Sequence, residues 1–349
     1  MNRGKKQWFQ MIRKMRVMLV GLVPMIFWCL GCQQNECESR VSYQAVNIND
    51  HLDLDSLFIP PDSLELSRVW EAWKSADLIS DSFFVKLEIP FYEGKKMQVI
   101  EHYSGGDKHY GAVVIPADYD KTKKYPLVVW ANGLDQRNPE VDALGWVVRT
   151  LNKGLEDHFL LIPSFRGQSL KTNNGRYCSD GFFGDAFDGA TEDALRLLEL
   201  VKGNFEGVDS GRITVCGMSR GGTVALLMAA RDTTIKAAVS IAGPTFFLSK
   251  EVYNRYRPQY KYQFLSKAIP FEEIREKIIK CSPMYFVDAY PNDLLLIHGK
   301  NDEVVPLDNA EKIIDLLEGK ENFESLITDD GHAFYDWQRV IDWILEYNG

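Results

Sequence analysis

The stretch Gly217-Met218-Ser219-Arg220-Gly221 places one serine between two glycines, directly after the apolar run RITVC. A serine at a sharp turn from a strand into a helix can act as a nucleophile, because small neighbours let the chain turn tightly and expose the hydroxyl. The following GGTVALLMAA predicts that helix, whose N-terminus favours negative charge near the serine. The motif is short enough to arise by chance, and the serine could also be an ordinary helix cap. Partner residues are therefore needed to identify the chemistry.

A serine hydroxyl needs a base to take its proton and an acid to orient that base. His332 lies in DDGHAF, just after the last predicted strand, and Asp302 lies in HGKNDEVVP, on the loop after the preceding strand. All three side chains therefore follow the C-terminal ends of predicted parallel strands, which meet at one edge of a sheet. The order Ser219, Asp302, His332 predicts a nucleophile, an orienting acid and a general base.

The competing histidines and acids fit this chemistry less well. His298 lies within an apolar strand, where we expect a structural role. The other histidines lie in the N-terminal lead, in the first strands or before a strand: His51, His102, His109 and His158. Asp329 and Asp330 are too close to His332 in sequence to reach round its ring, and Asp308 is the remaining alternative acid.

The negative charge that develops during acyl transfer needs two N–H donors. The backbone N–H of Arg220, directly after the serine, is the first candidate. The loop after the strand YPLVVW offers Gly133 or Leu134 as the second, and the sequence does not distinguish between them. Asn132-Gly133 could also be an ordinary turn.

The elements that must position these residues alternate along the chain. A helix is predicted from Ser63, after Pro60-Pro61. Three antiparallel strands follow, and then short apolar runs alternate with helical stretches, which predicts a mostly parallel sheet with helices on both faces. The strands are expected over 83–91, 96–104, 110–119, 125–133, 158–165, 212–219, 236–243, 293–300 and 323–332, and helices over 190–201, 222–230 and 308–319. Residues 80–349 are expected to form one α/β catalytic domain.

Residues 246–283 interrupt the alternation with a segment rich in aromatic and basic residues. An insertion between two strands lies over their carboxyl ends, where open α/β sheets bind ligands. We expect a helical partial lid. A helical pair that merely covers the edge of the sheet is an equally good interpretation.

The first 31 residues differ from the rest of the chain. Six basic residues and no acidic ones precede an apolar run of about 14 residues, which is typical of a signal peptide and too short to span a membrane. The run ends in CLGC and resembles a bacterial lipoprotein signal with Cys32 as the lipidated residue, although Cys29 and Leu30 are imperfect for that pattern. A plain secretory signal or an uncleaved anchor are the alternatives.

Residues 32–79 are then a polar tether and a helical lead-in. The sequence therefore predicts an exported protein of a bacterial cell envelope, held to the membrane through Cys32, in the periplasm or on the outer surface.

Charge and cysteine usage exclude several classes of protein. Removing the six positive charges of residues 1–31 takes the net charge from −9 to −15, which repels nucleic acid. The remaining cysteines lack the CxxC spacing of metal sites and indicate no disulfide framework: Cys32, Cys37, Cys178, Cys216 and Cys281. Whether Cys37 pairs with Cys178 is left open, and Cys216 is expected to be a small buried hydrophobe. No metal and no cofactor are predicted, and the oligomeric state is not indicated.

Together these motifs resemble the α/β-hydrolase superfamily and, within it, the catalytic domain of prolyl-oligopeptidase-like serine peptidases, over roughly residues 110–349. The likeness lies in the nucleophile block from Val208, FRGQS from Phe165, the acid block from Cys281 and the DGH around Gly331. The resemblance implies an α/β-hydrolase fold, Ser219, Asp302 and His332 as a catalytic triad, and an acyl-enzyme intermediate.

Two features qualify that resemblance. Only about 75 residues separate Cys32 from Lys108 whereas a propeller blade needs about 40 or more, so we expect no propeller, and its amine-binding acids are not carried over. Arg166-Gly167-Gln168 is similar to the RGQ motif of acetyl-xylan and cephalosporin-C deacetylases, but those enzymes tend to have Gln and Glu where this chain has Arg220 and Ala333. In either family Arg166 is expected to form a structural ion pair, with Asp188 or Asp193 as partner.

The sequence thus predicts a cofactor-free serine hydrolase that cleaves an amide or ester bond in a small peptide or an acylated sugar. A prolyl-oligopeptidase-like peptidase is slightly favoured. A carbohydrate deacetylase is the alternative, and a non-catalytic binding protein on a hydrolase fold is the third interpretation.

Overall fold

The computed structural model describes residues 52–135, 139–266, 269–290 and 293–348. The chain separates into two compact units, 1–38 and 39–349, and the described residues all belong to the second. The predicted signal segment, Cys32 and His51 lie outside the described residues. None of the helices within the described ranges is long and apolar enough to cross a membrane.

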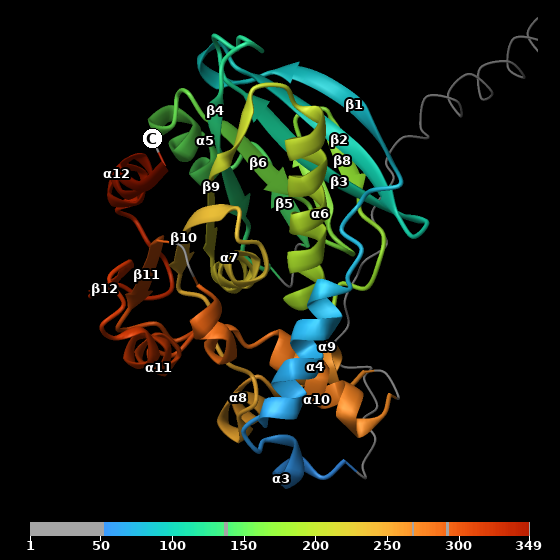
Figure 1. Cartoon of the computed structure of the whole chain (residues 1–349), viewed down its shortest axis with the longest axis vertical. Helices are drawn as coiled ribbons and strands as arrows, with labels where there is room; N and C mark the ends of the chain where they lie inside the picture. The colour runs from blue at the N-terminus through green and yellow to red at the C-terminus, as the bar shows by residue number, and fades with distance from the viewer. Residues whose placement is uncertain (1–51, 136–138, 267–268, 291–292, 349) are drawn as a thin grey trace, which may run out of the picture. The chain divides into compact units, whose positions relative to one another are not determined.

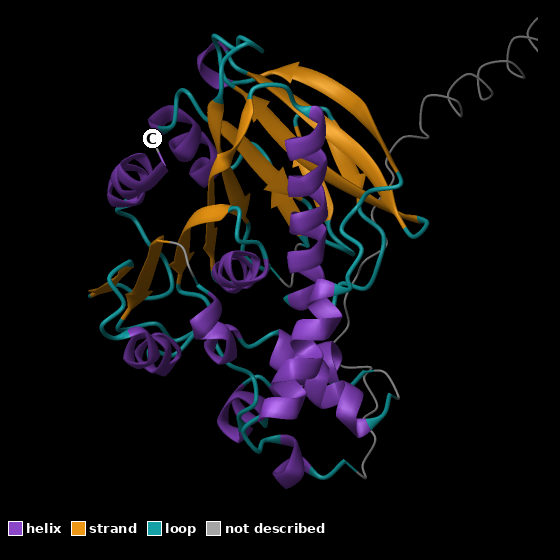
Figure 2. Ribbon diagram, viewed as in Figure 1, coloured by secondary structure: helices purple, strands orange, loops and turns teal. Residues whose placement is uncertain are grey.

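A nine-stranded sheet forms the centre of the described unit (Figures 1 and 2). Its strands lie side by side in the order β1-β2-β3-β6-β4-β9-β10-β11-β12. Neighbours from β1 to β6 pair antiparallel, and those from β6 to β12 pair parallel. This confirms the predicted antiparallel start and parallel continuation. The strands are β1 (Ser82–Pro90), β2 (Lys96–Ser104), β3 (Asp107–Ile115), β4 (Tyr125–Ala131), β6 (Phe159–Pro163), β9 (Val208–Met218), β10 (Ile235–Ile241), β11 (Asp293–Gly299) and β12 (Phe323–Thr328).

A second, three-stranded sheet was not predicted from the sequence. It consists of β5 (Glu140–Asp142), β7 (Ser169–Thr172) and β8 (Gly175–Cys178), which are too short to show a periodic pattern. Cys178, at the end of β8, is disulfide-bonded, whereas Cys216 and Cys281 are free and buried. The interpretation of Cys216 as a buried hydrophobe is therefore confirmed.

Helices cover both faces of the nine-stranded sheet (Figure 1). On one face α5 (Trp146–Gly154) packs beside α12 (Trp337–Asn348). On the other, α6 (Asp188–Asn204) packs beside α7 (Arg220–Arg231), and α11 (Asp308–Leu317) lies near β11. Helix α7 is buried on every side, which is typical of a central helix made of small and apolar residues.

The insertion between β10 and β11 is helical, as predicted. It forms α8 (Lys250–Arg255), α9 (Arg257–Phe264) and α10 (Phe271–Lys280), followed by the 3₁₀ segment η3 (Pro283–Ala289). Two N-terminal helices, α3 (Leu54–Leu57) and α4 (Ser63–Lys74), lie against these elements at the lower end of Figure 1.

One arginine of α10 holds the two N-terminal helices. The Arg275 guanidinium donates to both carboxylate oxygens of Glu65 at 2.6 and 2.8 Å. It also donates to three backbone carbonyls, those of Ser56 and Leu57 in α3 and of Ile59 just after it. The insertion is therefore anchored to a part of the chain some 210 positions earlier.

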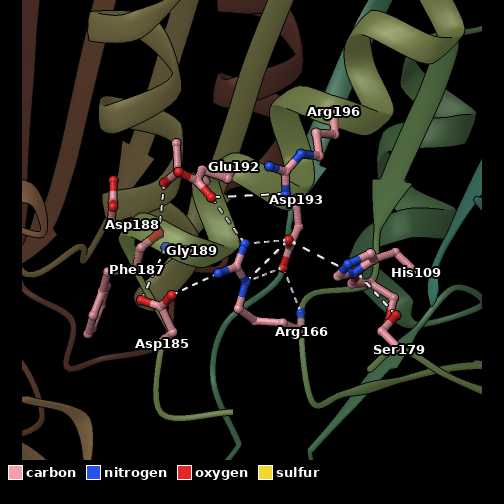
Figure 3. Close-up of polar contacts among 12 residues, drawn as sticks. His109, Arg166, Ser179, Asp185, Phe187, Asp188, Gly189, Glu192, Asp193 and Arg196 are labelled. Atoms are coloured by element: carbon pink, nitrogen blue, oxygen red, sulfur yellow. Dashed lines mark hydrogen bonds and ion pairs between the residues drawn. The ribbon is translucent and has the colours of Figure 1, made fainter. Parts of the chain in front are cut away.

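A buried network around Arg166 joins the loop after β6 to α6 (Figure 3). The guanidinium donates to both oxygens of Asp193, at 2.8 to 3.2 Å, and to Asp185 at 2.8 Å. Glu192 lies 3.3 Å from the same group. Burial alone would lower the pKa of Arg166, but these three carboxylates raise it, and Arg166 stays charged.

The expected partner Asp193 is thus confirmed, whereas Asp188 is wrong as a partner of Arg166. Asp188 instead accepts from Arg231 at 3.0 Å and from the indole Nε1 of Trp73 at 2.8 Å. The reason is geometric, because residues five positions apart on α6 point about 140° apart around the helix.

The Arg166 network predicts a large effect on stability. Arg166→Met leaves the carboxylate of Asp193, whose side chain is 1% exposed, without its cation. We expect the free energy of unfolding to fall by about 3–5 kcal/mol, measured by urea denaturation at pH 7. Lys96→Met is the matched control: its pair with Glu88 is exposed, and the loss should stay below about 1 kcal/mol. Equal losses in the two variants would contradict this interpretation of the network.

The burial of two histidines predicts that the folded state loses stability in acid. Burial is the main cause that lowers the pKa of both His102 and His158 to about 4, and both ring nitrogens of His158 lack a hydrogen-bond partner among the described residues. The unfolded chain binds these protons near pH 6.5, so stability is complete above that pH and is lost as the pH falls toward 4. Between pH 7 and 5 each histidine should cost about 1–2 kcal/mol.

The measurement is urea unfolding of the wild type and of His158→Phe at both pH values. The variant keeps a ring of similar size and removes one titrating group, so its loss of stability between pH 7 and 5 should be smaller. An unchanged loss would show that His158 is not one of the groups responsible.

Candidate active site

Ser219 stands between β9 and α7, at the C-terminal end of a strand in the middle of the sheet. Its backbone has φ 56° and ψ −125°, a conformation that costs a non-glycine residue about 1–3 kcal/mol. The flanking glycines are required by space. A Cβ on Gly217 would lie 2.1 Å from the carbonyl oxygen of Gly221, and a Cβ on Gly221 would lie 1.9 Å from that of Ala131. The motif therefore lets α7 start directly against the strands, with Ser219 at the turn.

His332 follows β12 and reaches Ser219 at the carboxyl edge of the sheet. Its Nε2 lies 3.0 Å from Ser219 Oγ, and its Nδ1 lies 2.7 Å from Asp302 Oδ2. A carboxylate beside Nδ1 makes that nitrogen the hydrogen-bond donor, which leaves Nε2 free to accept the serine proton. The structure therefore brings together three residues that lie 113 and 30 positions apart in the sequence.

The Asp302 carboxylate is held by the loop that carries it. Its side chain is buried, and Oδ1 accepts the backbone N–H groups of Val304 and Val305, each at 2.8 Å. Burial raises the pKa of this carboxyl, but the hydrogen bonds from His332 and from the two backbone N–H groups together lower it. Asp302 is therefore ionised at neutral pH and fixed in orientation.

The competing residues lie elsewhere or make other contacts. His298 is buried next to the triad acid, with Nε2 2.9 Å from the carbonyl oxygen of Val305 and 3.6 Å from Asp302 Oδ2, which agrees with its expected structural role. His102 and His109 stack on each other on β2 and β3, with ring centres 5.6 Å apart. Asp329 pairs with Lys300, and Asp308 with Lys312.

The predicted oxyanion donors also lie at the serine. Arg220 is the first residue of α7, where a backbone N–H has no acceptor within the helix. Gly133 packs against the turn: a Cβ on it would lie 3.6 Å from the Cβ of Ser219. Leu134 lines the same cavity as Ser219. The structure thus brings both candidates for the second donor beside the nucleophile.

A cavity of about 150 Å³ opens at Ser219. The insertion forms much of its wall, and the loop after Asp302 forms another part. No Asp or Glu is found among its described lining residues, which are Leu134, Phe187, Ser219, Arg220, Pro244, Phe246, Phe247, Val252, Tyr256, Gln259, Tyr260, Gln263, Phe264, Val304, Val305, Pro306 and Asn309.

Two features of the site were not predicted from the sequence: the individual residues that line the cavity, and the contacts of the Arg220 side chain. Arg220 is buried, and its guanidinium donates to the carbonyl oxygens of Asn132 and Gly133 and to the side chain of Gln168. A charged residue directly after the nucleophile, where the deacetylases have glutamine, was the available signal. The aromatic content of residues 246–264 was the signal for the wall.

Within the part of the chain that the structure describes, no group of three or more His, Cys, Asp and Glu side chains could hold a metal ion. The polar groups that meet at Ser219 are a histidine, a carboxylate and backbone amides. These are the components of nucleophilic acyl transfer.

The sequence matches the models of two families of serine hydrolases. Residues 172–347, just over half of the chain, match the prolyl oligopeptidase family. Residues 84–256 match the acetyl xylan esterase family. The first match contains Ser219, Asp302 and His332, and the second contains the Arg166-Gly167-Gln168 motif together with Ser219.

Curated relatives and solved structures agree with both matches. The chain is 25% identical to the mouse prolyl endopeptidase FAP over 71% of this chain and 31% of the relative, and 25% identical to bovine dipeptidyl peptidase 4 over 87% and 39%. It thus spans well under half the length of these relatives.

Among solved structures, acetyl xylan esterase 1 from Thermoanaerobacterium sp. superposes with a TM-score of 0.62, at 18% identity, over 85% of this chain and 99% of that one. A puromycin-hydrolyzing peptidase from Mycobacterium tuberculosis superposes with a TM-score of 0.54, at 19% identity, over 70% and 37%. These likenesses establish the α/β-hydrolase fold. The fold, the sequence match over half its length and the arrangement at Ser219 show that the chain belongs to the prolyl oligopeptidase family.

Proposed function

We propose that this chain is a serine hydrolase that cleaves an ester or amide bond through an acyl-enzyme intermediate. The observation that carries the proposal is the continuous hydrogen-bonded chain from Ser219 Oγ through His332 to Asp302, at 3.0 and 2.7 Å. A serine on a strained turn has no structural need for an oriented imidazole, whereas a nucleophile does.

In the proposed mechanism His332 Nε2 takes the proton of Ser219 as Oγ attacks the substrate carbonyl carbon. The resulting oxyanion accepts from the N–H of Arg220 and from that of Gly133 or Leu134. His332 then gives the proton to the leaving amine or alcohol, and the acyl-enzyme forms. Water repeats the cycle, with His332 as base, and releases the acid. Asp302 holds the ring and stabilises its positive charge throughout.

The cavity supports an uncharged, apolar acyl group as the part of the substrate bound next to Ser219. Its lining is mostly aromatic and aliphatic, and a cavity of about 150 Å³ is large enough for one benzene-sized ring. Because none of the described residues that line it is a carboxylate, they offer a free amine no anionic partner. Residues 246–283 act as a partial lid, since they supply eight of the seventeen lining residues.

Peptide cleavage is the first choice of reaction, because the chain belongs to a peptidase family. The substrate would then be a peptide with a neutral, apolar residue before the cleaved bond. Removal of acyl groups from a sugar is the second candidate, which the match to acetyl xylan esterases over residues 84–256 favours.

We further propose that the protein acts in a bacterial cell envelope, anchored through a lipid at Cys32 after removal of residues 1–31. The basic and apolar composition of that segment supports export. The disulfide at Cys178 supports an oxidising compartment, because structural disulfides are rare in the cytosol.

The proposed triad predicts loss of activity on substitution. With an aryl acetate and with aminoacyl and prolyl anilides as substrates, Ser219→Ala and Asp302→Asn should each lower kcat/KM by about 10³-fold or more. The first variant removes the nucleophile, and the second the charge that orients His332. Thermal unfolding should show that both variants remain folded.

Asp308→Asn is the control, because Asp308 is the alternative acid and its carboxylate pairs with Lys312 and accepts from Asn309. Its kcat/KM should stay within about twofold of wild type. Anilide turnover would establish a peptidase, and ester turnover alone a deacylase. Activity that survives in Ser219→Ala would overturn the triad and favour the interpretation as a binding protein.

The shape of the cavity predicts a change of selectivity. Val252 of α8 lines the cavity, and Val252→Phe fills part of it. We expect kcat/KM for a 4-nitrophenyl benzoate to fall about 10- to 100-fold, since space for a few carbons is worth about 1–3 kcal/mol, while the acetate ester changes less than about threefold. Asn254→Phe adds the same ring at an exposed position of the same helix and should change neither. If Val252→Phe lowered kcat/KM equally for both esters, the acyl group would not bind in the part of the cavity next to Val252.

A further inference from the structure

The side chain of Arg220 is a buried cation beside the nucleophile that the proposed mechanism does not use. It is 2% exposed and stacks on the ring of Phe165, with 4.1 Å from the guanidinium carbon to the ring centre. Its three hydrogen-bond acceptors are all neutral: the carbonyl oxygens of Asn132 and Gly133, each at 3.0 Å, and Oε1 of Gln168 at 2.9 Å. No carboxylate of the described residues forms an ion pair with it.

This placement costs stability on two counts. A buried charge without a counter-ion is unfavourable, and burial accordingly lowers the pKa of Arg220, to about 9. A cation at the first position of α7 also faces the positive end of the helix dipole. Arg166, by contrast, is surrounded by Asp185, Glu192 and Asp193. The retention of Arg220 as a buried cation without an ion-pair partner in the described part of the chain therefore indicates that it has a function.

The geometry of the contacts indicates what that use is. A peptide group is planar and trans, so the carbonyl oxygen of one residue and the N–H of the next are fixed in opposite directions in one plane. The Asn132 carbonyl shares its plane with the N–H of Gly133, and the Gly133 carbonyl shares its plane with the N–H of Leu134. The fork of Arg220 therefore holds both peptide groups that carry the candidate second donor of the oxyanion hole.

We propose that the Arg220 side chain is a positioning residue of the oxyanion hole: it fixes the two peptide planes of the loop 132–134, and its charge, which forms no ion pair among the described residues, favours the negative charge of the tetrahedral intermediate. This inference rests on the proposed serine-hydrolase function. It gives the loop a fixed orientation whichever of its two N–H groups is the donor. Gln168, in the loop after β6, completes the arrangement, because its Oε1 accepts from the third nitrogen of the guanidinium.

Two substitutions at this position separate the fork from the charge. Arg220→Met keeps the length and the apolar stem but has neither donors nor charge. Arg220→Lys keeps the charge and loses the planar fork. Arg231→Met is the matched control, a buried arginine at the far end of the same helix that pairs with Asp188. It should lower the thermal midpoint and leave kcat within about twofold.

The first readout separates kcat from KM on the best ester or anilide substrate of the full-length protein. Because the oxyanion exists only in the transition state and not in the bound substrate, Arg220→Met should lower kcat about 100-fold and change KM less than about threefold. Arg220→Lys should give an intermediate kcat. A kcat for the lysine variant equal to that of the methionine variant would overturn the contribution of charge, and one equal to wild type would overturn that of the fork.

The second readout is inhibition by phenylboronic acid. Ser219 Oγ forms a bond to boron, its proton passes to His332, and boron becomes a tetrahedral anion without loss of a leaving group. If Arg220 positions the oxyanion hole, the inhibition constant should rise in Arg220→Met by a factor similar to the fall in kcat. If Arg220 were merely structural, Arg220→Met would instead change the stability and KM. The inhibition constant of the boronic acid would then change by the same factor as the KM of the neutral substrate.

The two readouts distinguish failure of this inference from failure of the proposed function. If the wild type binds the boronic acid no better than Ser219→Ala does, the serine chemistry itself is wrong. If binding depends on Ser219 and Arg220→Met binds as tightly as wild type, the serine chemistry stands and the role assigned to Arg220 is wrong.

Discussion

The site depends on the strained backbone of Ser219, which the neighbouring strands and helix hold in a conformation that the serine would not adopt alone. Ser219 N–H donates to the carbonyl of Ile241 on β10 at 2.8 Å, and its own carbonyl accepts from Gly222 and Thr223 of α7. Each of these bonds exists only if β9, β10 and α7 are in register. The strain is therefore offset by the whole central part of the sheet. Activity and folding are coupled at this residue, because a shift of α7 by a fraction of an ångström would close the space that Gly217 and Gly221 leave open.

The same arrangement explains how charge is distributed around the site. Glu192 and Asp193 of α6, together with Asp185 just before that helix, all pair with Arg166 of the loop after β6. These acids are thereby kept from the nucleophile, where a negative charge would oppose an oxyanion. Asp302 is the carboxylate that remains at the site, and its charge is shared with His332 and two backbone amides. Arg220 forms no ion pair among the described residues, although the charge of Asp193 acts on it, and its guanidinium places a positive charge beside the turn.

Much of this could be predicted from the sequence, for physical reasons. Buried parallel strands read as continuous apolar runs, so the ends of β4, β6, β10 and β11 were predicted to within two residues, and β9 was found although it begins four residues earlier than predicted. Parallel strands also direct their C-terminal loops to one edge, which is why Ser219, Asp302 and His332 could be grouped without a structure. Their order along the chain then assigned a role to each.

The sequence pattern did not contain the rest. Strands β5, β7 and β8 are three or four residues long and have no period to detect. The choice between Asp188 and Asp193 depends on how α6 is rotated, and both are acidic residues of one helix. The buried side chain of Arg220 was equally hidden, because a charged residue near a helix start usually points to solvent. Side-chain contacts that join segments 52 to 88 positions apart, such as those of Arg220, are products of the tertiary fold.

The wall of the cavity is held in place by a part of the chain that contains none of the triad residues. Helices α8 and α9 supply five of its seventeen lining residues, and α9 contacts α10, whose Arg275 is anchored to α3 and α4. Phe58 of the N-terminal segment packs against Tyr253 and Tyr260 from behind, at 5.8 and 6.1 Å between ring centres. Tyr260 in turn lines the cavity.

The position of the cavity wall is therefore set by the lead-in to the catalytic domain. A substitution in residues 54–74 should change the position of the cavity wall through this packing. Ser219, Asp302 and His332 are held by the sheet and should keep their geometry. Selectivity and catalysis are thus supported by separate sets of contacts, and this separation lets loops vary on a constant catalytic scaffold.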